Sequence, residues 1–222
     1  GSTRISTGVL RATEPLLAFF ADAKKESLHD LDQVLDGYIQ GGGAVTVADI
    51  EGAWEDVNSP WDVLQLNERI LQNLTNHRPT PAGLNAVGAV HVGKNSYVAP
   101  SATLVGPVTV GEGCHIGEFT VIGPYVSIRN NTTVGAHSEI RRSILNNNVL
   151  VDSRALIRGS ILDDGVNIAS GFVCHEANTA EGLVGCVIGA DTEIGPDCRA
   201  ASGTLMAAET RIPPGTRITR QE

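Results

Sequence analysis

Aromatic residues are scarce in this chain, and long apolar runs are absent from it. The 222 residues include two tryptophans, three tyrosines and four phenylalanines, against 25 glycines. The length suffices for one or two packed domains, but the core must be built from small aliphatic side chains, which argues against a conventional helical bundle. No stretch approaches the roughly 18 consecutive apolar residues of a membrane span, and no charged leader followed by an apolar run indicates a signal peptide.

Lysine is also rare, and acidic residues dominate. Lys24, Lys25 and Lys94 are the only lysines, and the formal net charge is −9. Such a chain lacks the basic footprint that non-specific binding to nucleic acid or to anionic membranes requires. We therefore expect a cytoplasmic protein with neither nucleic acid nor membrane as a partner. Residues 1–75 hold 12 acids against 5 bases, whereas residues 76–222 hold 13 against 11, which predicts two unlike pieces.

A six-residue repeat governs the sequence from residue 92 onward. Each unit holds an aliphatic residue, often a glycine next, and a small or β-branched residue four places after the aliphatic one. After nine successive units the phase moves by four residues and resumes, and it then breaks between about residues 172 and 182 before a third run. The predicted aliphatic positions are Val92, Val98, Leu104, Val110, Ile116, Ile122, Ile128, Val134 and Ile140, then Ile144, Leu150, Leu156, Leu162 and Ile168, then Ile188, Ile194, Ala200, Met206, Ile212 and Ile218.

A period of six does not fit an amphipathic helix, whose period is 3.6, and it predicts short parallel strands with aliphatic columns inside. The pattern resembles the left-handed parallel β-helix of hexapeptide-repeat proteins, in which three hexads form one coil. The resemblance implies a mainly β domain of about seven coils over residues 84–222, packed as a homotrimer. The phase places Cys114, Cys186 and Cys198 at small interior positions. The four cysteines, which form no CxxC motif, are therefore expected to be reduced.

Residues 3–75 follow a different pattern. Strands are predicted over residues 4–11 and 44–50, and helices over residues 13–20, from residue 27 or 28 to 40, and over 63–74. Ser59, Pro60 and Asp62 suit the N-cap, N1 and N3 positions of the last helix. Two strands make a poor sheet, so residues 3–75 are interpreted as the end of a larger α/β domain. Residues 76–83, which contain two prolines, form the predicted linker.

One passage in this segment resembles a specific family. Residues 53–64, followed by Asn67 and Glu68, resemble the closing W-x-D-(I/V)-G-x-P-W-D-(L/V)-L…N-E passage of sugar-1-phosphate nucleotidyltransferases. The family joins a nucleoside triphosphate to a sugar 1-phosphate and releases pyrophosphate, with Mg²⁺ bridging the substrates. By residue, the resemblance implies that Asp56 helps bind Mg²⁺. Asn58 stands where the family usually has glycine, and we expect this difference to alter the turn that follows Asp56.

The glycine-rich G-x-G-T-R loop of that family has no counterpart in the 222 residues. Backbone amides of such loops bind the triphosphate. We therefore expect the chain to be a C-terminal portion of a longer enzyme and to be inactive in nucleotidyl transfer on its own. The sequence identifies neither the sugar nor the base.

The β-helix also resembles that of the bifunctional enzyme of UDP-N-acetylglucosamine synthesis, which acetylates glucosamine 1-phosphate with acetyl-CoA. Arg141 and Arg142 match the basic pair in the sugar-phosphate pocket of that enzyme, and Arg129 matches its upstream arginine. Asn167 begins a stretch that matches its N-I-G-A-G turn, with Ala169 and Ser170 departing from it. The resemblance implies substrate or anion binding by these residues. Ser153 stands where that family has its catalytic histidine, and a serine of ordinary acidity does not act as a general base at neutral pH. An acetyl-CoA-dependent acetyltransferase is therefore the second hypothesis, and a non-catalytic module for trimerisation or effector binding is the third.

Another histidine offers a candidate base. His175, followed by Glu176, lies in the break of the repeat, where an excursion from the coils can line a ligand groove. His91, His115 and His137 fall at outward positions, which indicates surface or interface residues. Their spacing does not match the zinc ligands of hexapeptide carbonic anhydrases.

Arginine spacing gives the last prediction. Allowing for the phase shift, Arg142 and Arg158 are expected one coil apart in the same column, about 5 Å from each other. Like charges at this distance need an anion or an acid as partner. Two alternatives remain open, neutralisation by Glu139 or a bound phosphate. The predicted anion-binding set is Arg129, Arg141, Arg142, Arg158 and Asn167.

Overall fold

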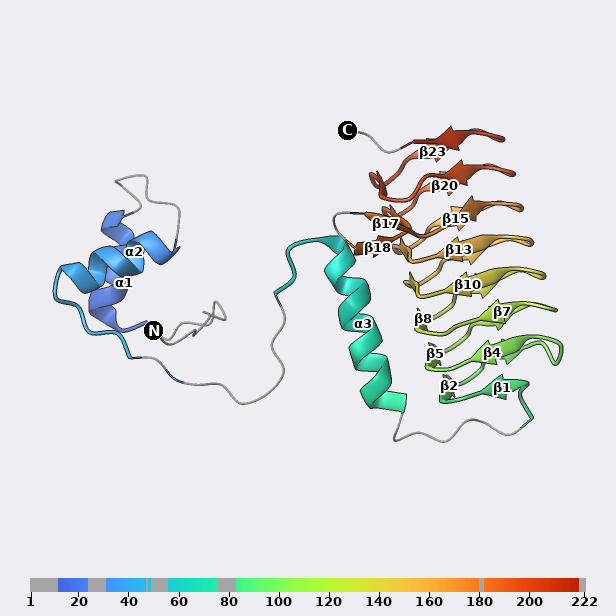
Figure 1. Ribbon diagram of the computed structural model, residues 1–222, viewed down its shortest axis with the longest axis horizontal. Coiled ribbons are helices and arrows are strands. Elements are labelled where there is room, and N and C mark those ends of the chain that lie inside the picture. Colours follow the sequence, from blue (N-terminus) through green and yellow to red (C-terminus); the bar gives the residue numbers. More distant parts are fainter. Residues whose placement is uncertain are drawn as a thin grey trace. The chain divides into compact units, whose positions relative to one another are not determined.

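The computed structural model describes residues 12–23, 31–46, 48, 56–75, 83–179 and 182–219. By their internal contacts the residues fall into two compact units, Gly1–Asp56 and Val57–Glu222. In the second unit, a stack of short strands is accompanied by one long helix (Figure 1). The predicted strand over residues 4–11 and the motif residues 53–55 lie outside the described residues.

The first unit contains two described helices, α1 (Glu14–Ala23) and α2 (Leu31–Gln40). Leu16 and Val34 are buried, and the rings of Phe19 and Tyr38 meet edge to face with centroids 5.5 Å apart. Helix α2 ends at Gln40, as predicted. Residues 44–46 and 48, part of a predicted strand, form no strand.

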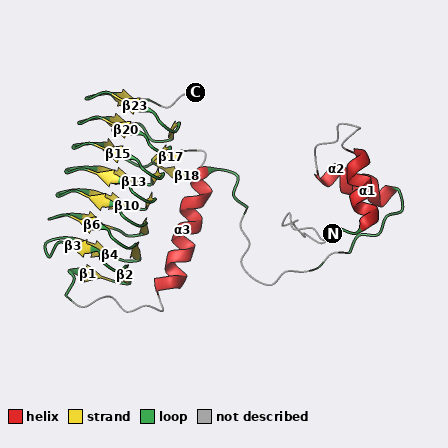
Figure 2. Cartoon of the chain, turned by 180° about the vertical axis from the view of Figure 1, so that it is seen from behind, coloured by secondary structure: helices red, strands yellow, loops and turns green. Residues whose placement is uncertain are grey.

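Three parallel sheets make up most of the second unit, and each coil of the chain contributes one strand to each sheet (Figure 2). Sheet A has the order β1 (Ala86–Val87), β4 (Thr103–Val105), β7 (Val121–Ile122), β10 (Glu139–Arg141), β13 (Leu156–Arg158), β16 (Val173–Cys174), β21 (Arg199–Ala200) and β24 (Arg217–Ile218). Sheet B has the order β2 (Val90–Val92), β5 (Val108–Val110), β8 (Val126–Ile128), β11 (Ile144–Leu145), β14 (Ile161–Leu162), β19 (Cys186–Ile188) and β22 (Thr204–Met206). Sheet C contains β3 (Tyr97–Val98), β6 (His115–Ile116), β9 (Thr133–Val134), β12 (Leu150–Val151), β15 (Asn167–Ile168), β20 (Glu193–Ile194) and β23 (Arg211–Ile212). The predicted left-handed parallel β-helix is confirmed.

Up to Ile140 the predicted phase of the repeat is confirmed. Leu104, Ile122 and Ile140 are register partners on sheet A, and each has an exposed fraction of 0%. Glycine follows the aliphatic residue because successive coils approach closely there. A Cβ atom on Gly135 would lie 2.6 Å from the backbone nitrogen of Ser153. All four cysteines are buried and free, which agrees with a packing role.

After Ile140 the predicted phase is wrong at Ile144, Leu150 and Leu156, and it is confirmed again at Leu162 and Ile168, both with exposed fractions of 0%. The interior positions belong to Leu145, Val151 and Ile157, all with exposed fractions of 0%, and not to the residue before each of them. Leu145 pairs with Ile128, 17 residues earlier, where a full coil has 18. The chain has therefore lost one residue at this turn, whereas the sequence pattern suggested a larger shift.

The shortened turn is built by a left-handed residue followed by a buried serine. Arg142 has a φ of 47°, and the same turn in the next coil has Gly159 with a φ of 58°. The Ser143 hydroxyl donates to the Arg141 carbonyl at 2.6 Å and accepts from the backbone N–H of Ser160 at 3.1 Å. The Ser143 hydroxyl therefore satisfies backbone groups in two successive coils, and no buried side-chain nitrogen or oxygen in the described part of the chain lacks a hydrogen-bond partner.

Helix α3 (Pro60–Thr75) packs on the outer face of sheet B. Trp61 and Leu64, 4% and 1% exposed, contact a patch that includes Ile144, Ile161 and Val187. One residue of each adjacent aliphatic pair on these strands lies inside the β-helix, and the other lies beneath α3. Although the sequence pattern grouped α3 with residues 3–75, its apolar face is buried by the β-helix.

The predicted start of α3 is confirmed. The Asp62 carboxylate accepts the backbone N–H groups of Ser59 at 2.8 Å and Asn58 at 3.0 Å. These hydrogen bonds, with that of Ser59 the largest, lower the pKa of Asp62. Asp62 is therefore a carboxylate that caps the helix, as an N3 acid does in a capping box.

None of the helices in the described part of the chain combines the length and apolar character that a membrane crossing requires.

Candidate anion-binding site

Two arginines stand one above the other on the outer face of sheet A. Arg141 ends β10 and Arg158 ends β13, and the two are direct register partners. Neighbouring strands lie about 4.8 Å apart, so two guanidinium groups in this position repel each other. The structure supplies one acid between them: Glu139 Oε1 accepts Arg141 Nε at 2.7 Å and Arg158 Nη2 at 2.6 Å. Of the two alternatives left open by the sequence, neutralisation by Glu139 is therefore present.

Glu139 is held in its charged form. Burial opposes ionisation of its carboxyl group, but the hydrogen bonds and charges of Arg158 and Arg141 outweigh burial and hold the pKa of Glu139 below its ordinary value. Two guanidinium groups share one carboxylate, so the cluster keeps a surplus positive charge. The side chains of Arg141 and Arg158 are 41% and 35% exposed, which leaves that charge accessible to a solute.

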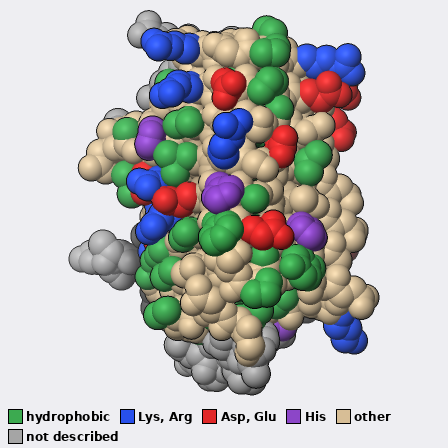
Figure 3. All heavy atoms as spheres, turned by 90° about the vertical axis from the view of Figure 1, so that its right-hand side faces the viewer, with side chains coloured by type: hydrophobic (Ala, Val, Ile, Leu, Met, Phe, Trp, Pro, Cys, Tyr) green, Lys and Arg blue, Asp and Glu red, His purple; other side chains and the backbone are tan. Residues whose placement is uncertain are grey.

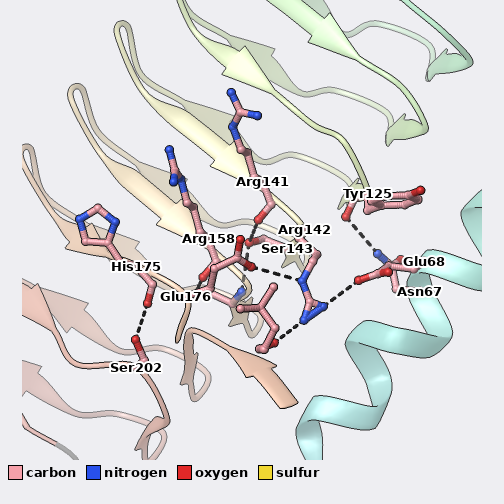
Figure 4. Close-up of polar contacts among 12 residues, drawn as sticks. Asn67, Glu68, Tyr125, Arg141, Arg142, Ser143, Arg158, His175, Glu176 and Ser202 are labelled. Atoms are coloured by element: carbon pink, nitrogen blue, oxygen red, sulfur yellow. Dashed lines mark hydrogen bonds and ion pairs between the residues drawn. The ribbon is translucent and has the colours of Figure 1, made fainter. Parts of the chain in front are cut away.

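His175 continues the line of basic side chains. Cys174 pairs with Ile157, so the residues that follow these two in the chain, His175 and Arg158, fall in the same outward column. Figure 4 shows Arg141, Arg158 and His175 extending from three successive coils toward the same side. The His175 carbonyl accepts the Ser202 hydroxyl at 2.7 Å, which fixes the backbone at this point.

Arg142, predicted to share a column with Arg158, does not do so. Its left-handed backbone turns the side chain away from sheet A toward α3 and the hairpin of β17 (Ala177–Thr179) and β18 (Gly182–Val184). There it donates to Glu68 at 2.7 Å, to Glu176 at 3.2 Å and to the Leu183 carbonyl (Figure 4). The predicted column was wrong by one residue because the coil shortens by one residue and not two.

The remaining predicted site residues lie apart from this cluster. Arg129 follows β8 of sheet B and borders a hollow of about 390 Å³ beside α3. Asn167 lies on sheet C, in a hollow of about 380 Å³ with Glu193 and Arg211. Ser153 donates to the Asp152 carboxylate at 3.3 Å. The structure thus brings Arg141 and Arg158 together, and it does not bring Arg129, Arg142 or Asn167 to them.

Asp56 is exposed at the end of the first unit. Among the residues that the structure describes, no three His, Cys, Asp or Glu side chains are grouped as metal ligands. The described residues therefore do not make up a magnesium site, and the role of Asp56 as a ligand stays a prediction.

Two further arginines on sheet A were missed. Arg199 in β21 and Arg217 in β24 are register partners, 18 residues apart in the chain. That separation is one full coil, so the repeat length alone could have predicted that Arg199 and Arg217 are neighbours. The partners of Arg142 on α3 and on the excursion had no such signal, because Glu68 is 74 residues away in the sequence.

Comparison with known proteins locates the similarity in the β-helix. Residues 104–207 match the family model of the GMPPB C-terminal domain. The bifunctional protein GlmU of Methanococcus aeolicus is 32% identical over 98 residues, 43% of this chain and 24% of that protein. Glucose-1-phosphate thymidylyltransferase of Streptomyces antibioticus is 28% identical over 118 residues, 52% of this chain and 32% of the relative.

Acyl transferases are similar as well. The 2,3,4,5-tetrahydropyridine-2,6-dicarboxylate N-succinyltransferase of Methylorubrum populi is 31% identical over 137 residues, 62% of this chain and 41% of that enzyme. A crystal structure of a Bacillus cereus protein described as a putative acetyltransferase aligns with 59% of this chain and 76% of its own, at 20% identity and a TM-score of 0.37. This chain spans between 24% and 41% of the length of the three relatives compared by sequence. The resemblance to sugar-1-phosphate nucleotidyltransferases that carry a hexapeptide-repeat β-helix is thus confirmed, through a β-helix whose residues 104–207 match the GMPPB C-terminal domain.

Proposed function

We propose that this chain is the C-terminal portion of a cytoplasmic sugar-1-phosphate nucleotidyltransferase whose β-helix serves trimeric assembly or ligand binding. In the reaction, a phosphate oxygen of the sugar 1-phosphate attacks the α-phosphorus of a nucleoside triphosphate. The new P–O bond forms as the bond to pyrophosphate breaks, which yields a nucleotide sugar and pyrophosphate. The observation that carries the proposal is the match of residues 104–207 to the GMPPB C-terminal domain.

The way α3 joins the β-helix supports this proposal. Three residues of the nucleotidyltransferase-like passage make the contact: Trp61 is buried against sheet B, the Asn67 amide oxygen accepts the Ser127 hydroxyl at 2.6 Å, and Glu68 binds Arg142. The part of the passage from Val57 onward therefore belongs to the same compact unit as the β-helix. Such contacts are expected where a catalytic domain continues directly into a β-helix.

The proposed enzyme uses Mg²⁺, and Asp56 is the ligand that this chain would contribute. When bound between the substrates, the metal supplies charge neutralisation on the phosphates. In the proposed enzyme, Asp56 supplies one carboxylate oxygen, and the other ligands come from outside the described residues.

The test is product formation by the full-length protein. Each nucleoside triphosphate is combined with a panel of sugar 1-phosphates, and the nucleotide sugar is identified by mass spectrometry. We expect one preferred pair of substrates, and we expect Asp56→Asn to lower the rate by about 100-fold or more. Asp36→Asn, which removes an exposed acid of the same unit, is the matched control and should leave the rate unchanged. Absence of a nucleotide sugar with every pair would contradict the proposal.

One observation favours acetyl transfer as a second candidate. His175 lies in the same column as Arg141 and Arg158, so a basic nitrogen adjoins a site suited to an anionic substrate (Figure 4). In that case, His175 would take the proton of an attacking amine. A thiol-release assay with acetyl-CoA and glucosamine 1-phosphate tests this candidate on the chain itself. Release that is lost in His175→Gln supports it, and no release in the unaltered chain rejects it.

A further inference from the structure

The last two coils of sheet A carry a pair of like charges without a counter-charge. Arg199 and Arg217 are direct register partners on adjacent strands, about 4.8 Å apart. Both side chains are exposed on the outer face of the sheet. Among the side chains that the structure describes, no carboxylate lies within 4.0 Å of either guanidinium group.

The other register pair of arginines, and one arginine of sheet C, each have a carboxylate nearby. Glu139 bridges the register pair Arg141 and Arg158. On sheet C, Arg211 lies 3.6 Å from Glu193, its register partner. The pair on the last coils thus differs from the register pair Arg141 and Arg158, which has a carboxylate between its charges, and an external anion could take the place of that carboxylate.

The two arginines also border a hollow. Its volume is about 430 Å³. Its lining includes His175, Arg199, Arg217 and Thr219, together with the apolar side chains of Val173 and Ala201. Lysine or arginine and histidine side chains follow one another down the left edge of the molecule in Figure 3, with acidic side chains at one point among them. Two guanidinium groups and one imidazole therefore border the same hollow in a chain whose net charge is −9.

We propose that this hollow binds a phosphate-bearing anion, with Arg199 and Arg217 as its principal ligands. Guanidinium groups present planar pairs of N–H donors that match phosphate oxygens, and charge-assisted hydrogen bonds of this kind are the strong ones. Two arginines one strand apart can contact neighbouring oxygens of a phosphate or pyrophosphate group, and His175 stands at the edge of the site as a third donor. The site is separate from the chemistry of nucleotidyl transfer and does not depend on it.

The test is calorimetric titration of the chain with inorganic pyrophosphate and with inorganic phosphate at low salt. We expect saturable binding of pyrophosphate that weakens as salt rises. Arg199→Gln and Arg217→Gln should each lower the affinity by about tenfold or more. Arg211→Gln is the matched control, because it removes the same charge from the same end of the β-helix but from a residue paired with Glu193. Circular dichroism spectra identical to that of the unaltered chain establish that the variants fold.

Three results would overturn the proposal. One is absence of binding by the unaltered chain up to about 1 mM pyrophosphate. Another is an equal loss of affinity in Arg199→Gln and in Arg211→Gln, which would reflect net charge and not a site. The third is a change in molar mass on replacing Arg199, with no change in pyrophosphate binding, which would assign the pair to contact with a second copy of the chain. Since the titration needs no catalysis, its outcome is independent of the proposed transferase activity.

Discussion

Replacement of Arg142 tests how the β-helix is joined to α3. The guanidinium group donates to Glu68 on α3, to Glu176 and to the Leu183 carbonyl of the hairpin. A single side chain therefore connects three segments that are distant in the sequence. Arg142→Gln removes the charge and most of the donors while it keeps a polar side chain of moderate length. Glu68 and Glu176 would then face each other without a cation between them.

The magnitude follows from the burial of the three charged groups. The side chains of Arg142, Glu68 and Glu176 are 18%, 26% and 24% exposed. Ion pairs on an open surface contribute about 0 to 1 kcal/mol, and removal of one partner from a buried pair costs about 3 to 5 kcal/mol. A partly buried arginine with three acceptors lies between these limits, so we expect a loss of about 2 to 3 kcal/mol. For a unit of this size, that loss lowers the Tm by about 4 to 12 °C.

The assay combines thermal melting with hydrogen exchange, and the chain offers a matched control. Arg154 also has a left-handed backbone, with a φ of 61° against 47° for Arg142, but its side chain is exposed. Arg154→Gln therefore reproduces the backbone effect without the lost contacts, and its Tm should stay within about 2 °C of the unaltered chain. Amides of α3 and of the hairpin should exchange faster in Arg142→Gln alone. Equal melting temperatures and equal exchange in the two variants would refute the role assigned to Arg142.

Three other predictions follow from the interior, the surface and the assembly of the β-helix. Ile157→Ala should lower the free energy of unfolding by about 2 to 5 kcal/mol because it leaves a cavity in the interior, whereas Leu156→Ala should lower it by about 1 kcal/mol or less. If Leu156→Ala lowered the Tm more than Ile157→Ala, Leu156 would be the interior residue, as the sequence pattern predicted. Because the pKa of Glu139 in the fold lies below its ordinary value of 4.5, Glu139 stabilises the fold above about pH 4.5, and this contribution is lost as the pH falls through the lowered pKa. The Tm of Glu139→Gln should thus depend less on pH below 4.5, and an unchanged dependence would contradict the arginine bridge. Light scattering at several concentrations should give three times 23.3 kDa, with contacts through faces other than the one that α3 covers, and a stable monomer would reject the trimer.

The β-helix could be predicted from sequence because the same pattern of interior and exterior positions recurs in many successive units. From Val92 to Ile140 every sixth residue is aliphatic, and only one phase fits. Beyond that point the strands carry adjacent aliphatic pairs, as in Ile144 and Leu145, and either member satisfies the pattern. At Ile144 the outward member of the pair is buried by α3, and the periodicity of the sequence contains no information on that contact.

The candidate site was predictable to the extent that it depends on neighbours along a strand or one coil away. Glu139 was one of the two partners predicted for an arginine pair, and it does bridge a pair, although the pair is Arg141 and Arg158 and not Arg142 and Arg158. Glu139 and Arg141 are two places apart on one strand and therefore face the same side. The partners of Arg142 could not be predicted, because they come from a helix and a hairpin whose positions follow from tertiary packing. The one-residue error in the arginine column has the same origin as the error in phase, a turn shortened by Arg142 and Ser143.

Pyrophosphate release is the most direct test of the proposal that this β-helix belongs to a nucleotidyltransferase. The full-length protein and the 222-residue chain are assayed side by side with nucleoside triphosphates, sugar 1-phosphates and Mg²⁺, and acetyl-CoA thiol release is followed in parallel. We expect pyrophosphate release that requires both substrates in the full-length protein, none in the chain alone, and no thiol release in either. Thiol release by the chain together with no pyrophosphate release by the full-length protein would contradict the account and establish an acyltransferase in its place.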